Sequence, residues 1–290
     1  MNRKFAIVTD SGCDMPADYF KAREIVCVKL GFTMNNVNYE GEDGEHISEK
    51  DFYQALRDGA MPTTYQVTGE TAKKYIGKKL EAGEDEFVLT FSSGLSGTAG
   101  SFQVAARELA EQYPARKIFV VDSLCASMGQ GLLLDYIVKF AETGATIEET
   151  VAYAESLKGK ICHHFTVDNL FHLKRGGRVS SVTAIVGSIL KIKPIMHVSD
   201  EGKLVVIGKA IGRKKSLKTL VDNLLELKDM DETDEIFISH GDCIEDVEYV
   251  RGLLLEKMPK VKITVNYVGT VIGTHSGCGT LAIFHKGKHR

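Results

Sequence analysis

The sequence has 290 residues, of which 36 are lysine or arginine and 39 are aspartate or glutamate, so its formal net charge is −3 at pH 7. This balance gives no overall attraction to nucleic acid or to an anionic membrane, and neither is expected as a partner. No apolar run is long enough to span a bilayer, and the first residues pass into a strand pattern rather than a signal peptide. We therefore expect a cytoplasmic protein without stable membrane insertion. Its six cysteines show no C-x-x-C spacing and are interpreted as reduced thiols.

An order of strand, polar turn and helix repeats along the chain. Residues 5–8 form an apolar run that leads into Thr9-Asp10-Ser11-Gly12, and the same pattern follows residues 87–91, 117–121 and 236–239. Short apolar strands that alternate with helices indicate a buried parallel sheet with right-handed crossovers. Ligands of such sheets bind beyond the carboxyl ends of the strands, so we expect the polar turns to converge on one cleft.

Capping patterns predict where several helices begin. Ser48, Thr68 and Thr146 each precede a helical pattern, and those at Ser48 and Thr146 resemble capping boxes. Residues 129–140 are almost wholly apolar, which predicts a helix that is buried on most sides. Small residues near its start permit either close packing or space for a ligand; these are Ala126, Ser127, Gly129 and Gly131.

The turn at residues 91–98 is the richest in polar chemistry. An apolar run is followed by hydroxyls and two glycines, and a helical pattern begins directly afterwards. The first N–H groups of a helix lack internal partners, so such a turn favours a negative oxygen. Ser96 also suits a helix N-cap, although capping accounts for one hydroxyl only. Thr98 replaces the final glycine of a G-x-S-x-G nucleophile elbow, and no phosphate-binding lysine follows.

The pattern changes after about residue 158. Two apolar runs flank an Asp/Gly turn at residues 199–202, which predicts a β-hairpin and hence antiparallel pairing. Further elements are predicted as helices over 214–227 and 245–258, and strands over 235–239, 261–267 and 281–285. The sequence thus predicts an α/β fold with an N-terminal parallel-sheet domain at 1–158, a C-terminal mixed domain at 159–290, and a ligand at the cleft between them.

Two polar segments of the second half are candidates for a binding site. Residues 173–178 place three cations around Gly176-Gly177, which suits either the binding of an anion or an exposed basic loop. His275 lies within the glycine-rich segment 269–279. Such a flexible turn seldom needs a histidine for packing, so a functional role is favoured.

A metal site is not expected. Cys162-His163-His164 is the one cluster that invites the hypothesis, but adjacent residues point in different directions. No second ligand cluster has suitable spacing. The sequence therefore predicts neither a metal nor a cofactor.

Several separated motifs together resemble the DegV family of bacterial proteins over essentially the whole chain. They are VTDS at 8–11, TTYQ at 63–66, FSSGLSGT at 91–98, VDS at 121–123, LKRGGR at 173–178 and IGTHSG at 272–277. The resemblance implies a two-domain protein that encloses a long-chain fatty acid of the palmitate, oleate or stearate class. It also implies that the chain is not an enzyme. It presents the acid to a separate fatty acid kinase, which forms an acyl phosphate for an acyltransferase and phospholipid synthesis.

The resemblance carries over to particular residues of the head-group site. Thr64 and either Ser93 or Ser96 would bind the carboxylate, and Arg178 and His275 would lie close to it. Thr63 would lie beside Thr64 in the same motif. No residue of this chain would be catalytic.

The tail and the partner surface are further expectations. Segments 129–134 and 185–190 would line the tunnel for the acyl chain, and Arg213 with its basic neighbours would contact the kinase. The sequence departs from the family at Tyr65 and Val67, where serine and proline are usual, and at Cys278, where proline is usual. Tyr65 and Val67 would change ligand shape preference or kinase contact without abolishing binding.

Two other classes of function stay open. A serine esterase or acyl hydrolase would use Ser93 or Ser96 with His275, and it requires a fixed Ser–His hydrogen bond and an oxyanion hole. An enzyme resembling the dihydroxyacetone kinases would need a nucleotide site. Turnover of a chromogenic ester or of ATP by the protein alone distinguishes these classes from a binding protein.

Overall fold

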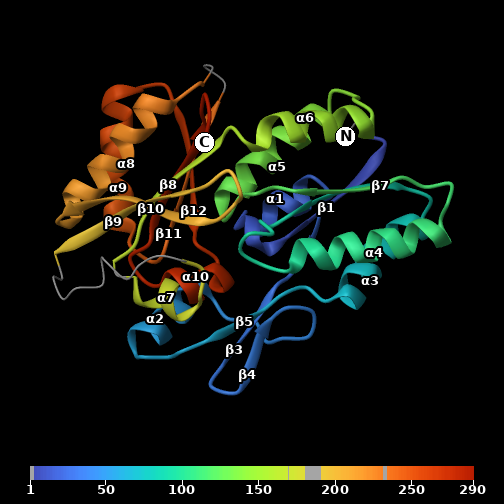
Figure 1. Ribbon diagram of the computed structural model, residues 1–290, viewed down its shortest axis with the longest axis horizontal. Coiled ribbons are helices and arrows are strands. Elements are labelled where there is room, and N and C mark those ends of the chain that lie inside the picture. The colour runs from blue at the N-terminus through green and yellow to red at the C-terminus, as the bar shows by residue number, and fades with distance from the viewer. Residues whose placement is uncertain (1–2, 169, 180–190, 231–233) are drawn as a thin grey trace.

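The computed structural model describes residues 3–168, 170–179, 191–230 and 234–290, and within them the chain forms three β-sheets (Figure 1). The first sheet has the order β2-β1-β6-β7, and all its strands are parallel. In chain order these strands are β1 (Phe5–Asp10), β2 (Val26–Val28), β6 (Asp85–Thr90) and β7 (Ile118–Asp122). The predicted N-terminal parallel sheet is thereby confirmed.

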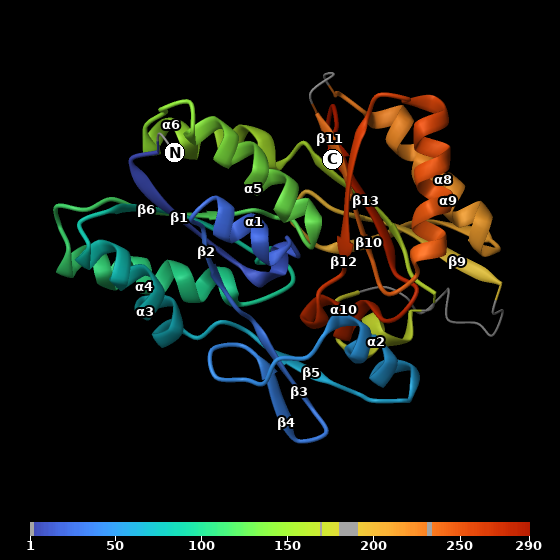
Figure 2. The ribbon, with the colours of Figure 1, turned by 180° about the vertical axis from the view of Figure 1, so that it is seen from behind.

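Helices cover both faces of this parallel sheet (Figures 1 and 2). On one face Val8 and Val88 pack against α3 (Gly69–Glu81) and α4 (Thr98–Gln112). On the other face Ile7 and Leu89 pack against the remaining helices of this half. Those helices are α1 (Ala17–Ala22), α5 (Met128–Ala141) and α6 (Ile147–Lys158), with a short 3-10 turn η1 (Ser11–Cys13) before α1. Successive side chains of a strand point to opposite faces, so a continuous apolar run supplies both layers.

A second, antiparallel sheet with the order β4-β3-β5 was not predicted. It consists of β3 (Gly31–Met34), β4 (Val37–Glu40) and β5 (Thr63–Tyr65), and α2 (Glu49–Arg57) packs on it. Asn35 and Asn36 join β3 to β4 with φ of 51° and 65°. Positive φ at both positions of a two-residue hairpin loop is the type I′ geometry, which asparagine tolerates well.

The third sheet has six strands in the order β10-β9-β8-β13-β11-β12. Only the pair β11–β12 is parallel among the pairs that the structure describes. The strands are β8 (Ile161–Thr166), β9 (Ile192–Val198), β10 (Leu204–Ile211), β11 (Glu235–His240), β12 (Lys262–Tyr267) and β13 (Leu281–Lys286). This mixed sheet and the β9–β10 hairpin confirm the fold predicted for the second half.

Helices lie on both sides of the mixed sheet as well. Its outer face packs against α8 (Arg213–Leu227) and α9 (Ile244–Lys257). Its inner face contributes Phe237 and Phe284 to the same apolar core as α5, so α5 lies between the two large sheets (Figure 1). The predicted boundary at residue 158 falls between α6 and β8.

The helix starts follow the predicted caps. The side chains of Ser48, Thr68 and Thr146 each accept a hydrogen bond from a backbone N–H in the first turn of their helix, and Thr146 with Glu149 forms a capping box. The N-cap of α4 is Gly97 rather than Ser96, although Ser96 Oγ still accepts from Thr98 N at 3.3 Å. Among the described residues, no helix combines the length and apolar character needed to cross a membrane.

Candidate functional site

A cavity of about 340 Å³ lies where the two large sheets meet the short helix α10 (Thr270–Ser276). Turns at the carboxyl ends of three strands contribute to its wall: residues 91–97 after β6, Ala126 and Ser127 after β7, and Ser239 at the end of β11. Their convergence was expected from the parallel-sheet rule. The cavity is thus built by both halves of the chain.

The turn after β1 supports this wall from behind. Asp10 accepts hydrogen bonds from Phe91 N at 2.6 Å and from Gly12 N at 2.9 Å. Burial raises the pKa of Asp10 to about 6, although both N–H donors oppose the shift. The carboxyl group therefore ties the first turn to the turn at residue 91.

The polar end of the cavity is formed by side chains from distant parts of the sequence. Thr64 Oγ1 lies 2.8 Å from Nε2 of His275, and both residues line the cavity with Ser96 and Arg178. The Arg178 guanidinium donates to Leu95 O at 3.3 Å and to Gly176 O. These contacts aim a fixed positive charge at the same end of the cavity as the hydroxyls.

His275 is held neutral at this polar end. Burial lowers the pKa of His275 to about 4, and the nearby positive charges of Arg178 and Arg175 act in the same direction. Nδ1 of this ring is buried and has no hydrogen-bond partner within the described part of the chain. An added anion with hydrogen-bonding oxygens would offset the arginine charges.

The rest of the cavity wall is mainly apolar. Its side chains come from the turn after β6, from the strands β8, β10 and β13, and from the two short helices α7 (Phe171–Arg175) and α10. The apolar lining residues include Phe91, Leu95, Phe165, Leu173, Leu204, Ile272 and Phe284. A largely apolar space with a cluster of donors at one end suits an amphipathic molecule with a negative head group.

The remaining site predictions lie elsewhere. Thr63 and Ser93 are exposed and are not among the residues that line this cavity; Ser93 N instead donates to Asp122 Oδ1 at 3.2 Å. Arg213 donates to Asp246 at 2.9 Å through Nε and to Gly279 O at 2.6 Å, so its guanidinium is engaged within the chain.

The predicted tunnel segment 129–134 is not among the residues that line the cavity. Gly129 packs against the His163 ring and Gly131 against Met15, which is the close-packing alternative for the small residues of α5. The cavity contacts α5 only through Ala126 and Ser127 just before it. Residues 185–190 lie outside the described residues.

Sequence reasoning missed a polar link beneath the cavity wall. Ser127 Oγ donates to Asp14 and lies 2.9 Å from Ser239 Oγ. The backbone of Ser127 has a φ of 53°, which is in the left-handed region. Burial raises the pKa of Asp14 to about 7 against the effect of its hydrogen bonds. The signal available in the sequence was a serine between Ala126 and Met128 after a polar turn, which is too general to single out.

The geometry gives no support to a serine hydrolase at the predicted serines. Ser96 Oγ lies 3.0 Å from Thr98 Oγ1, whereas His275 is bonded to Thr64. A hydrolase needs its histidine bonded to the nucleophilic serine.

Comparisons with known proteins agree with this architecture. The family model described as "Uncharacterised protein, DegV family" matches residues 4–287. A DegV domain-containing protein of Clostridium perfringens is 42% identical over 285 residues, which cover 98% of each chain. A fatty acid-binding DegV family protein from Thermus thermophilus has a TM-score of 0.88 at 28% identity, covering 98% of this chain and 99% of that one. A stearic acid-binding protein from Eubacterium ventriosum has a TM-score of 0.84 at 25% identity, covering 97% and 98%.

Proposed function

Because the chain belongs to the DegV family, we propose that it binds a long-chain fatty acid in the cavity and presents the carboxylate to a separate kinase. The observation that carries this proposal is the cavity itself, which has a mainly apolar wall and a cluster of hydroxyl, imidazole and guanidinium groups at Thr64, Ser96, His275 and Arg178. The relatives from Thermus thermophilus and Eubacterium ventriosum, which bind fatty acids, support the same ligand class.

The carboxylate is proposed to lie among Thr64, Ser96, Arg178 and His275. Thr64 and Ser96 are neutral donors, and Arg178 supplies a permanent charge with a planar fork that matches a carboxylate. His275 orients the Thr64 hydroxyl across the 2.8 Å contact. Ser96 is preferred over Ser93 because Ser96 lines the cavity, whereas Ser93 is exposed.

The acyl tail is proposed to occupy the apolar part of the cavity. Each CH₂ buried there stabilises the complex by about 0.8 kcal/mol, so a chain of the palmitate, oleate or stearate class would derive most of its affinity from the tail. The head-group residues then determine orientation more than affinity. Tyr65 lines the cavity beside Thr64. Of the three positions at which the sequence departs from the family pattern, it is the one best placed to change which ligand shape is preferred.

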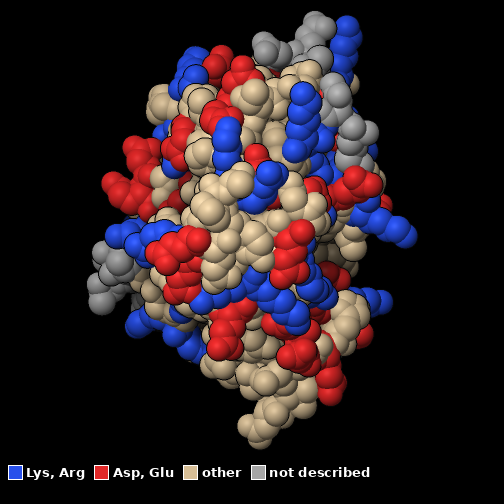
Figure 3. Space-filling view, turned by 90° about the vertical axis from the view of Figure 1, so that its right-hand side faces the viewer, with Lys and Arg blue, Asp and Glu red and all other residues tan. Residues whose placement is uncertain are grey.

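The bound acid is proposed to serve phospholipid synthesis in the cytoplasm, through a fatty acid kinase that forms the acyl phosphate and an acyltransferase that consumes it. This chain would act as the carrier and perform no chemistry. Positive and negative side chains are interspersed on the face drawn in Figure 3. Elsewhere, at the start of α8, Lys214 and Lys215 next to Arg213 are exposed. A kinase contact there would rely on local charges of this kind.

The test is mass spectrometry of the protein purified from a bacterial host. Under native conditions we expect the mass of each chain to increase by that of about one bound fatty acid. Extraction with organic solvent should release an acid of the palmitate, oleate or stearate class. Finding no acyl species on folded protein, and no uptake of added oleate, would contradict the proposal. Hydrolysis of a chromogenic ester by the protein alone would favour the esterase instead.

A further inference from the structure

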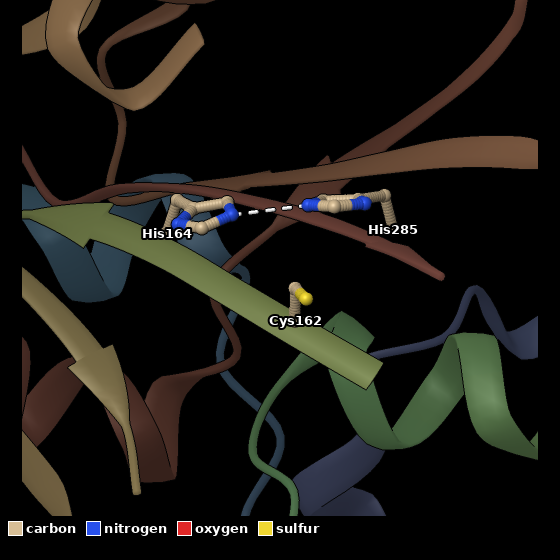
Figure 4. Close-up of side chains that lie close together, drawn as sticks. All are labelled: Cys162, His164 and His285. Atoms are coloured by element: carbon tan, nitrogen blue, oxygen red, sulfur yellow. Dashed lines mark hydrogen bonds between the residues drawn. The ribbon is translucent and has the colours of Figure 1, made fainter. Parts of the chain in front are cut away.

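A second group of buried polar side chains lies on the face of β8 turned away from the cavity (Figure 4). Cys162 and His164 of β8 and His285 of β13 place one sulfur and two ring nitrogens within 4.8 Å of one another. Residues two apart in a strand share a face, and the strand register sets Cys162 opposite His285. His163 points to the other face, where it lines the cavity. Neighbouring histidines therefore belong to different sites.

The atoms are close to the spacing that a tetrahedral metal site needs. Nε2 of His164 and Nε2 of His285 are 3.0 Å apart. Two nitrogens bound to one zinc ion at ~2.0–2.1 Å each would be roughly 3.3 Å apart, and a thiolate sulfur binds zinc at ~2.3 Å. Small side-chain rotations would bring all three atoms to such distances.

The protonation of His285 suits metal binding, whereas the hydrogen that His164 Nε2 donates to His285 has to move to His164 Nδ1 before Nε2 can bind a cation. His285 Nδ1 lies 2.9 Å from Lys286 O, so this nitrogen carries the hydrogen and Nε2 presents its lone pair to His164. A backbone carbonyl on the far nitrogen is the usual way in which a metal-binding histidine is oriented.

A purely structural role leaves part of this group unexplained. His164 is 3% exposed, yet its Nδ1 has no hydrogen-bond partner within the described part of the chain. Buried polar atoms without partners are costly, and apolar side chains would fill the space between β8 and α8 without that cost. None of the three residues lines the fatty acid cavity.

The surroundings of the cluster combine a further histidine and the carboxyl end of a helix with the positive charge of Arg290, whose Nε donates to Ile161 O at 3.2 Å. The pairing of Phe165 with Met196 sets His197 of β9 beside His164, and His197 is partly buried, although it is not among the three residues whose ligand atoms lie within 4.8 Å of one another. Gly287 packs against both Cys162 Sγ and Leu227 O at the end of the 15-residue helix α8. The carboxyl end of a helix carries partial negative charge.

From this geometry we propose that Cys162, His164 and His285 bind one zinc ion, with His197 or a water molecule in the fourth position. The Cys162 thiol loses its proton to solvent as the zinc–sulfur bond forms, and no oxidation or reduction takes place.

The test uses the full-length protein after treatment with a chelator. Zinc chloride is titrated against a chromogenic zinc indicator, and cobalt(II) is added separately to detect thiolate-to-cobalt absorption. We expect one zinc per chain, a cobalt–thiolate band, and release of one proton per zinc measured in buffers of different ionisation enthalpy. Affinity should fall at least tenfold in His285→Gln and in His164→Gln, and the cobalt–thiolate band should vanish in Cys162→Ser.

The matched controls are Cys27→Ser and His46→Gln, which change a cysteine and a histidine outside the cluster and should bind zinc as the unchanged protein does. Circular dichroism establishes that each variant is folded. Equal zinc affinity in folded His285→Gln, or no stoichiometric zinc uptake by the unchanged protein, would overturn the proposal. Fatty acid occupancy, measured in parallel, should be the same with and without zinc, so failure of the two proposals is distinguishable.

Discussion

The cavity and the Cys162–His164–His285 cluster lie on opposite faces of the same strand, and they differ in what surrounds their polar groups. The cavity has a volume of about 340 Å³ and a mainly apolar wall, and Thr64, Ser96, Arg178 and His275 form its polar end. The cluster is closed by α8 and by the adjacent strands, and its polar atoms face one another. An extended amphipathic ligand suits the first arrangement, whereas the ligand that we propose for the second is a single zinc ion.

The largest effect is expected when both neutral donors of the cavity are removed. Thr64→Ala combined with Ser96→Ala should retain the fold but lower kinase-coupled acyl phosphate formation by roughly 100-fold or more, because each buried donor to a charged acceptor is worth about 1.5–3 kcal/mol. The measurement is coupled turnover beside lipid occupancy.

The matched control for this pair is Thr63→Ala combined with Ser93→Ala, which alters exposed neighbours in the same two motifs. Its coupled rate should stay within about twofold of the unchanged protein, a difference of less than ~0.5 kcal/mol. Equal losses in the two double variants would remove the assignment of the carboxylate to Thr64 and Ser96.

Substitution of Arg178 tests whether the positive charge at the polar end of the cavity affects phosphorylation of the fatty acid or the binding of the fatty acid. Arg178→Ala should reduce coupled turnover by about tenfold or more while tail-driven lipid binding survives. Arg178→Lys should recover only part of the rate, since an ammonium supplies a point charge without the two-point fork. A fully active lysine variant would argue against a bidentate contact.

The histidines of the two sites should change the free energy of unfolding with pH in the same direction. Burial lowers the pKa of His275 to about 4, so between pH 6.5 and 4 the unfolded chain binds a proton that the folded chain does not. Its contribution to the free energy of unfolding is complete above pH 6.5 and is lost as the pH falls toward 4. His285 behaves alike for the same reason.

Urea unfolding of lipid-free, zinc-free protein at several pH values between 7 and 4 measures this effect. The stability difference between the unchanged protein and His275→Gln should change by up to about 3 kcal/mol across that range. The exposed His289→Gln variant is the control. Parallel stability curves for the unchanged protein and His275→Gln would mean that His275 is not held neutral.

The smallest effect is expected at Arg213, which belongs to neither site. Arg213→Ala should weaken association with the kinase in a salt-sensitive manner and leave lipid occupancy unchanged. Because the guanidinium also binds Asp246 and Gly279 O, thermal stability is measured alongside. A loss of lipid or of stability that matches the loss of coupled rate would exclude a docking role.

The parallel strands and the long helices were predictable because their signals are local. Apolar runs such as residues 5–8 and caps such as Thr146 act within one element. The small sheet of β3, β4 and β5 was missed because its strands are only three or four residues long and one of them lies far along the chain.

The candidate sites were predictable only in part, for a related reason. Thr64 and His275 are 211 residues apart, and His164 and His285 are 121 apart, so no spacing rule brings either pair together. The family resemblance pointed to the first pair before the fold was known. The second depends on strand register, which decides that His164 and not His163 meets His285.

The position of α5 between the two large sheets has a consequence for how the molecule melts. Its side chains share one apolar core with Phe87 of the parallel sheet and Phe284 of the mixed sheet. The first half alone would leave one face of that helix bare to water, and the second half alone would expose the inner face of its sheet, where Phe237 and Phe284 lie. Exposed apolar area of this kind drives aggregation. Heating should therefore produce a single cooperative unfolding transition, and fragments 1–158 and 159–290 made separately should fold only when they are mixed.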